Sequence, residues 1–251
     1  MIFEIPTSSV LRHRTSGPLL LLLLFGAACT AAQNPPENEG EANVAPGINA
    51  RYKSASLDVD HWVERFSGES REVYVARYEV LEALGLEPGD RIADVGAGTG
   101  LYTQLLAESV GPQGRVYAVD ISRPFLDFIA ENAAADGLDN VTTVLGEDRT
   151  SNLPAAAVDV IFHCDTYHHF EFPKTMTADL ARALAPGGEM FVLDFERIPG
   201  VSSDFILGHV RADKATVISE IETSGFELVE EVDLEGLSEN YLLKFRKVDA
   251  P

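Results

Sequence analysis

The chain has 251 residues, 45% of them hydrophobic, and carries 40 acidic against 19 basic residues, for a formal net charge of −21. This length and hydrophobic content suit one α/β domain with additional segments. The acidic excess disfavours a nucleic-acid backbone or an anionic membrane surface as the main partner, because both are polyanions.

The first 32 residues have the organisation of a bacterial export signal. Arg12 and Arg14 precede an apolar run at 18–28, which is too short to span about 30 Å of hydrocarbon but suits a secretory signal. In one interpretation the small residues before Cys29 form a lipobox, and Cys29 becomes the lipidated first residue of a lipoprotein. In the other, a signal peptidase cuts after Ala32. Both predict an exported protein, either periplasmic or held at the membrane through an N-terminal lipid anchor.

Residues 33–56 are rich in Pro, Asn, Glu, Gly and Ala and contain almost no large apolar side chains. Such a segment buries too little surface to offset its ordering entropy, so it is expected to be a flexible tether. The folded domain is expected at 57–251. Beyond Cys29 its only cysteine is Cys164, which lies in an apolar run and is expected to be a buried small hydrophobe.

From residue 57 onward, helical and strand patterns alternate, which indicates βαβ units and a parallel sheet. A helical pattern covers 59–85, with a break near Gly68. The expected strands are 91–95, 116–120, 141–145, 158–164 and 189–195, and the expected helices that follow are 101–108, 124–135, 174–184 and 214–223. Two more strand patterns, 226–232 and 241–248, are joined by a turn and predict a hairpin with an antiparallel strand.

Three glycines follow the first expected strand with the spacing Gly96-x-Gly98-x-Gly100. Glycine permits a sharp turn and close approach of a ligand, and the amides of the next helix then face that ligand. A dinucleotide fingerprint needs a glycine at position 101, where this chain has Leu101. A nicotinamide oxidoreductase is therefore the weaker interpretation of this turn.

Together with three later segments, this turn resembles the class I S-adenosylmethionine-dependent methyltransferases. The stretch 93–100 matches the family's D/E-x-G-x-G-x-G motif, and Asp120 ends the second strand, where the family has its ribose-binding acid. Residues 140–148 with 153–154 resemble the adenine-binding segment, and 184–188 match an L-x-P-G-G turn. The resemblance covers roughly 62–248 and is closest to exported bacterial methyltransferases of undefined substrate.

The resemblance implies a Rossmann-like α/β fold with a mostly parallel seven-stranded sheet, an antiparallel C-terminal strand and helices on both faces. It also implies S-adenosyl-L-methionine as the cofactor. The expected cofactor-binding residues are Asp94, Gly96, Ala97, Gly98, Gly100, Asp120, Ile121, Glu147, Asp148 and Asp165. The aromatic and basic residues of the first helical region have two interpretations, a lid over the cofactor or packing on the sheet edge. They are Trp62, Phe66, Arg71, Tyr74 and Arg77.

The acceptor end carries a weaker signature, because methyl transfer needs mainly alignment and needs a base only when the acceptor loses a proton. Tyr167, His168 and His169 follow the fourth strand and are the expected catalytic residues. His209 and Arg211 are expected to bind an anionic acceptor. Adjacent histidines without i, i+4 spacing or cysteine partners do not form a zinc motif, so no metal is expected.

The leading hypothesis is thus a methyltransferase that acts on a small-molecule or lipid-like acceptor, with no nucleic-acid partner. The alternative is a non-catalytic protein of the cell envelope that binds or senses S-adenosylmethionine or S-adenosylhomocysteine. The sequence does not indicate an oligomeric state.

Overall fold

The computed structural model describes residues 40–66, 68 and 71–248. The predicted export signal, Cys29 and the first residues of the predicted tether lie outside the described residues. Among the helices that are described, none has both the length and the apolar character needed to cross a membrane.

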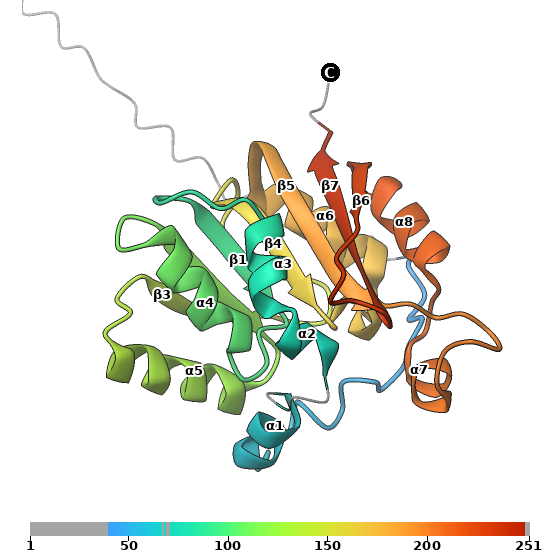
Figure 1. Ribbon diagram of the computed structural model, residues 1–251, viewed down its shortest axis with the longest axis horizontal. Helices are drawn as coiled ribbons and strands as arrows, with labels where there is room; N and C mark the ends of the chain where they lie inside the picture. The colour runs from blue at the N-terminus through green and yellow to red at the C-terminus, as the bar shows by residue number, and fades with distance from the viewer. Residues whose placement is uncertain (1–39, 67, 69–70, 249–251) are drawn as a thin grey trace, which may run out of the picture. The chain divides into compact units, whose positions relative to one another are not determined.

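A seven-stranded sheet with the order β3-β2-β1-β4-β5-β7-β6 forms the centre of the domain (Figure 1). Its strands are β1 (Arg91–Val95), β2 (Arg115–Asp120), β3 (Val141–Leu145), β4 (Val158–Cys164), β5 (Leu184–Phe195), β6 (Phe226–Val232) and β7 (Asn240–Lys247). β1 to β5 pair in parallel, whereas β7 pairs antiparallel with both β5 and β6. The predicted fold class, including the antiparallel C-terminal strand, is confirmed.

Helices surround this sheet, as the alternating sequence pattern predicts. They are α1 (Val59–Phe66), α2 (Glu72–Val75), α3 (Arg77–Ala83), α4 (Leu101–Val110), α5 (Arg123–Asp136), α6 (Pro173–Ala183), α7 (Asp204–His209) and α8 (Lys214–Glu222), with a short 3₁₀ turn at Tyr167–His169. The helical region expected at 59–85 with a break near Gly68 consists of α1, α2 and α3, and it is also interrupted at Ala76, between α2 and α3.

Two apolar cores lie against the sheet because successive strand residues point to opposite faces. In β1, Ile92 belongs to the core that includes Leu106 of α4, whereas Ala93 belongs to the core that includes Leu180 of α6. With both faces covered in this way, β1 and β2 are largely apolar, and their acids Asp94 and Asp120 lie at or next to the carboxyl ends.

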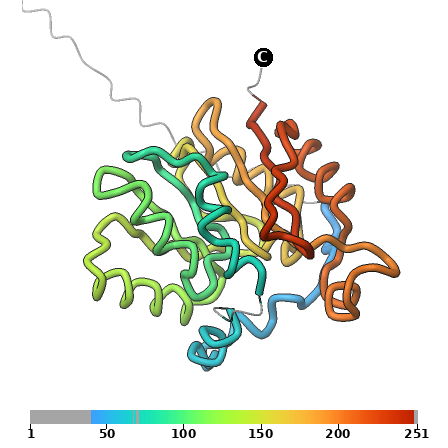
Figure 2. Tube along the Cα trace, viewed as in Figure 1, coloured from blue at the N-terminus to red at the C-terminus, as the bar shows by residue number. Residues whose placement is uncertain are grey.

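Residues 40–56, expected to be a flexible tether, run along the domain (Figure 2, blue) and make specific polar contacts with it. The Glu41 carboxylate accepts hydrogen bonds from the amides of Lys174 and Thr175, both at 2.8 Å, and so caps the start of α6. Farther along, the Asn49 amide donates to the His169 carbonyl at 2.9 Å. We call residues 41–53 the N-terminal strap. The low apolar content of these residues predicts a flexible segment, but hydrogen bonds rather than apolar packing attach them to the domain.

Candidate cofactor and acceptor site

A cavity of about 640 Å³ opens at the carboxyl ends of β1, β2 and β4. The strand order reverses between β1 and β4, because the chain passes from β1 to β2 and β3 on one side and later adds β4 and β5 on the other. Ligands of open α/β sheets bind at such a reversal. The cavity is lined by the glycine turn, the strap, α1 and the residues that follow β4.

At the glycine turn, an added side chain would strain the backbone or collide with a neighbouring residue. Gly96 has φ +77, and a Cβ there would lie 2.2 Å from Cγ2 of Thr166. Gly98 lines the cavity with φ +54. Gly100, with φ +83, precedes α4 and is not among the lining residues; a Cβ there would lie 2.8 Å from Cγ1 of Ile129. Gly100 is therefore required for packing against α5, whereas Gly96 and Gly98 shape the cavity wall.

Asp120 ends β2 and is held by two backbone amides. Gly98 and Ser122 each donate to its carboxylate at 2.8 Å. Burial raises the pKa of Asp120 to about 6, so the group is ionised at neutral pH. A carboxylate fixed in this way has further lone pairs for hydroxyl donors in the cavity.

Asp94, at the end of β1, is a second buried carboxyl group that lines the cavity. The Thr103 hydroxyl donates to it at 2.6 Å. Burial, together with the nearby Asp120, raises the pKa of Asp94 to about 7. A cationic group of a ligand would stabilise its ionised form.

Asp165 follows β4 and joins three distant parts of the chain. Its φ is +49, which is uncommon for a residue with a side chain. Asn240 of β7 donates to its carboxylate at 2.6 Å, and the Arg71 guanidinium forms an ion pair with it. Burial raises the pKa of Asp165, and Arg71 opposes that shift. The chain before α2 is thus tied to the floor of the cavity.

Aromatic rings from the strap and from α1 form one wall. Trp62 lies 5.0 Å from Tyr52 and 5.1 Å from Phe66 between ring centroids, and Phe66 lies 6.2 Å from Phe125 of α5. Trp62, Phe66 and Arg71 line the cavity, whereas Tyr74 and Arg77 do not. The lid interpretation thus fits the first three residues.

Glu147 and Asp148, the two acids expected near the adenine, both line the cavity, as do Ala97 and Ile121. Asp148 forms an ion pair with Lys53 of the strap at 2.5 Å. The strap therefore also closes over the segment that follows β3.

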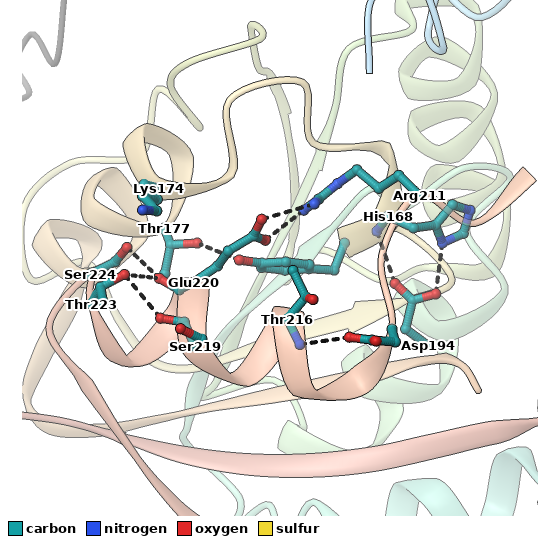
Figure 3. A network of polar contacts seen from close by, with 12 residues as sticks. His168, Lys174, Thr177, Asp194, Arg211, Thr216, Ser219, Glu220, Thr223 and Ser224 are labelled. Atoms are coloured by element: carbon teal, nitrogen blue, oxygen red, sulfur yellow. Dashed lines mark hydrogen bonds and ion pairs between the residues drawn. The ribbon is translucent and has the colours of Figure 1, made fainter. Parts of the chain in front are cut away.

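Three histidines gather at the other end of the cavity. The ring centroid of His209 lies 5.0 Å from that of His168 and 5.0 Å from that of His169. Nδ1 of His168 lies 2.7 Å from the Asp194 carboxylate, at the end of β5 (Figure 3). Burial tends to raise the pKa of Asp194, but the His168 ring and hydrogen bonds outweigh it and lower that pKa. Burial, with neighbouring imidazoles, lowers the pKa of His169 to about 3 and of His209 to about 4.

Residues 92–188 match a family model described as a methyltransferase domain. A protein-L-isoaspartate O-methyltransferase of Aeropyrum pernix is 32% identical over 162 residues, 63% of this chain and 53% of that protein. A demethylmenaquinone methyltransferase of Anoxybacillus flavithermus is 29% identical over 54% of this chain and 57% of that protein. The crystal structure of an S-adenosylmethionine-dependent methyltransferase from Aquifex aeolicus superposes with a TM-score of 0.65 at 24% identity, over 76% of this chain and all but 1% of that one. Residues 92–188 therefore form a methyltransferase domain, and the domain as a whole has the fold of the class I S-adenosylmethionine-dependent methyltransferases. The chain spans about half the length of the curated relatives it matches.

The residues of this methyltransferase domain fit S-adenosylmethionine, its cofactor. Gly96 and Gly98 line the cavity with backbone atoms and no side chain, and the Asp120 carboxylate has acceptor capacity for ribose hydroxyls. Asp94 suits the ammonium group of the methionine part. The predicted cofactor residues that line the cavity are Asp94, Gly96, Ala97, Gly98, Asp120, Ile121, Glu147, Asp148 and Asp165.

Two of the residues expected at the acceptor end, Tyr167 and Arg211, lie outside the cavity lining. Tyr167 has no exposed surface and lies outside the cavity lining; its hydroxyl faces Thr177 at 3.4 Å. Arg211 is also outside the lining and forms a double hydrogen bond with Glu220, at 3.0 and 2.8 Å (Figure 3). Both side chains are used in packing against α8, because the backbone after β4 turns Tyr167 away from the cavity that His168 and His169 face.

Arg51 and Asn49 of the strap also line the cavity, although no sequence pattern indicated them. Arg51 forms no ion pair with a residue that the structure describes, and its charge suits an anionic acceptor better than that of Arg211. No local motif distinguishes these residues, because they lie about 120 positions from the histidines they approach.

Proposed function

We propose that the protein transfers a methyl group from S-adenosylmethionine to a small or lipid-like acceptor. The observation that carries this proposal is a single cavity that extends from the glycine turn and Asp120 to His168, His169 and His209. A cofactor held by the first group of residues leaves the second group for an acceptor. The bound cofactor supplies an electrophilic methyl group on its sulfonium.

The chain contributes position and exclusion of water to this reaction. Aligning a nucleophile with the methyl group at about 3–3.5 Å accounts for much of the rate of such displacements. The aromatic wall of Tyr52, Trp62 and Phe66 covers the cavity with apolar surface. His169 and His209 have lowered pKa values and are therefore weak proton acceptors. We therefore assign His169 and His209 to binding of the acceptor rather than to general-base catalysis.

An exposed apolar side chain beside the histidines supports a lipid-like acceptor. Phe205 of α7 lines the cavity, is 52% exposed, and has its ring centroid 5.2 Å from that of His209. An acceptor with an apolar tail and an anionic or hydroxyl head group would place the head between Arg51 and the histidines.

We propose further that the protein is exported from a bacterial cytoplasm. The proposal depends on the basic residues, the apolar run and Cys29 of the first 32 residues. Mass analysis of the mature native protein tests it. A lipidated N-terminus at Cys29, or a free N-terminus after Ala32, is expected, and an unprocessed chain beginning at Met1 would contradict it.

Two measurements on the mature protein test the catalytic proposal. Calorimetry with S-adenosylmethionine and S-adenosylhomocysteine is expected to show one site per chain. Radiolabelled methyl transfer to fractions of cell-envelope extract is expected to label a lipid or small-molecule fraction, with Asp120→Asn as the binding-deficient control. Binding without transfer to any fraction would instead favour the sensor.

A further inference from the structure

Three imidazoles from two separated parts of the chain meet at the acceptor end of the cavity. His168 and His169 belong to the 3₁₀ turn after β4, and His209 ends α7. One ring nitrogen of each lies within 4.8 Å of those of the other two. In the sequence, adjacent His168 and His169 have neither i, i+4 spacing nor cysteine partners. The fold adds His209, forty positions later in the chain.

Hydrogen bonds fix the tautomers of two of these rings. The ionised Asp194 carboxylate only accepts, so Nδ1 of His168 carries the hydrogen in their 2.7 Å contact. Asn49 uses its amide nitrogen to donate to the His169 carbonyl, so its oxygen accepts from Nδ1 of His169 at 3.2 Å. In both rings Nε2 is left with its lone pair.

The free nitrogen of His168 is an exception to the usual pairing of buried polar atoms. His168 is 2% exposed, and its Nε2 has no hydrogen-bond partner. A buried acceptor without a partner costs free energy, so such atoms call for a specific explanation. Here the atom belongs to the cluster that faces the cavity.

We propose that His168, His169 and His209 bind a divalent cation of the zinc class, with an open coordination position toward the cavity. Neutral imidazole is a preferred ligand of Zn²⁺, and three protein ligands with one open position are typical of catalytic rather than structural sites. The carboxylate behind His168 and the amide behind His169 are the outer contacts that orient metal-binding histidines. With Zn–N bonds of about 2.1 Å, tetrahedral ligands lie about 3.4 Å apart. Small rotations of the rings would close the cluster on the ion.

The role of the ion rests on the proposed function, whereas metal binding does not. At the acceptor end, its open position would take a hydroxyl oxygen of the acceptor. A bound divalent cation lowers the pKa of such a hydroxyl and so activates it as a nucleophile. Ion and cofactor would then hold the two reactants at opposite ends of one cavity.

Titration of the untagged, metal-free mature protein with Zn²⁺, followed by calorimetry, tests the proposal. Wild type is expected to bind one ion per chain. His209→Ala is expected to weaken binding at least tenfold, and Asp194→Ala to weaken it by about 10–100-fold through loss of the outer contact. His61→Ala is the matched control, because His61 is an exposed histidine of α1 outside the cavity lining, and it is expected to bind as wild type does.

Binding of S-adenosylmethionine by each variant is measured in parallel, because it reports folding and the cofactor site independently of the metal. Retained cofactor binding with lost Zn²⁺ binding in His209→Ala supports the site. Equal Zn²⁺ binding by His209→Ala and His61→Ala, or no stoichiometric binding by wild type, would overturn it. Absence of methyl transfer together with intact Zn²⁺ binding would count against the proposed function and leave the metal site standing.

Discussion

Replacement of Asp120 by asparagine probes the cofactor site with the least change of shape. The carboxylate accepts hydrogen bonds from the amides of Gly98 and Ser122 and, on the assignment above, from two ribose hydroxyls. Asparagine keeps the volume but loses the charge, and one of its two terminal groups becomes a donor.

The expected effect follows from the hydrogen bonds that lose a charged partner. A hydrogen bond to a charged group contributes about 1.5 kcal/mol at the lower end of its range, so two ribose hydroxyls give about 3 kcal/mol. That loss corresponds to about 150-fold weaker binding of S-adenosylmethionine. The amide contacts to Gly98 and Ser122 also weaken, but they affect the free and bound protein alike.

The pH dependence gives a second, independent signature. Burial raises the pKa of Asp120 to about 6, so below pH 6 the wild-type carboxyl group is largely protonated and loses the charge that the ligand requires. Wild type is therefore expected to approach the variant, with the difference in affinity reduced by about tenfold at pH 5 relative to pH 7.

Calorimetric titration of S-adenosylmethionine into both proteins at several pH values checks both expectations. A difference of less than threefold at pH 7 would refute the assignment of Asp120 to the ribose. A large difference that stays constant from pH 7 to pH 5 would show instead that the carboxyl group acts through its shape and not through its charge.

Three further substitutions test other parts of the reasoning. Gly96→Ala places a Cβ 2.2 Å from Thr166, whereas the Cβ of Gly137→Ala meets nothing within 4 Å at a similar φ. Urea denaturation is expected to show that Gly96→Ala is destabilised by about 2 kcal/mol more than Gly137→Ala. Equal losses of stability in the two variants would contradict the clash. Burial lowers the pKa of His163 to about 4. As the pH falls, the unfolded chain therefore takes up a proton on His163 before the folded protein does, so wild type is expected to lose about 2 kcal/mol of stability between pH 8 and pH 5. His163→Phe is expected to retain that stability. An identical pH dependence would exclude this origin. Tyr167→Phe is expected to leave methyl transfer within about twofold and to cost about 1 kcal/mol of stability; a large loss of transfer in a folded variant would restore Tyr167 to the catalytic site.

The cofactor half of the site was predictable because its determinants are local. The bend at Gly96 and Gly98, the position of Asp120 at a strand end and the parallel sheet all depend on residue types over short stretches of chain. The physics of turns and strand ends is the same wherever such stretches occur. The rule that parallel strands present their carboxyl ends at one edge located these residues, and the resemblance to the class I methyltransferases supplied their roles toward the cofactor.

The acceptor half was not predictable in the same way. The composition of residues 40–56 does not indicate that Glu41 caps α6 or that Asn49 contacts His169. Each contact depends on a partner residue more than a hundred positions away, which the sequence of residues 40–56 does not contain. Tyr167 and His168 are adjacent in sequence but point to different places, one into the core and one to the cavity.

The fold class and the glycine turn follow from local sequence pattern and strand order, and the cofactor is what the resemblance of the motifs implies. The meeting of His209 with His168 and His169, the pairing of Arg211 with Glu220 and the closure of the cavity by the strap are visible only in the folded domain. The physical reason is that side-chain chemistry acts over a few ångströms in space, whereas the residues that meet there are separated by tens to more than a hundred positions along the chain.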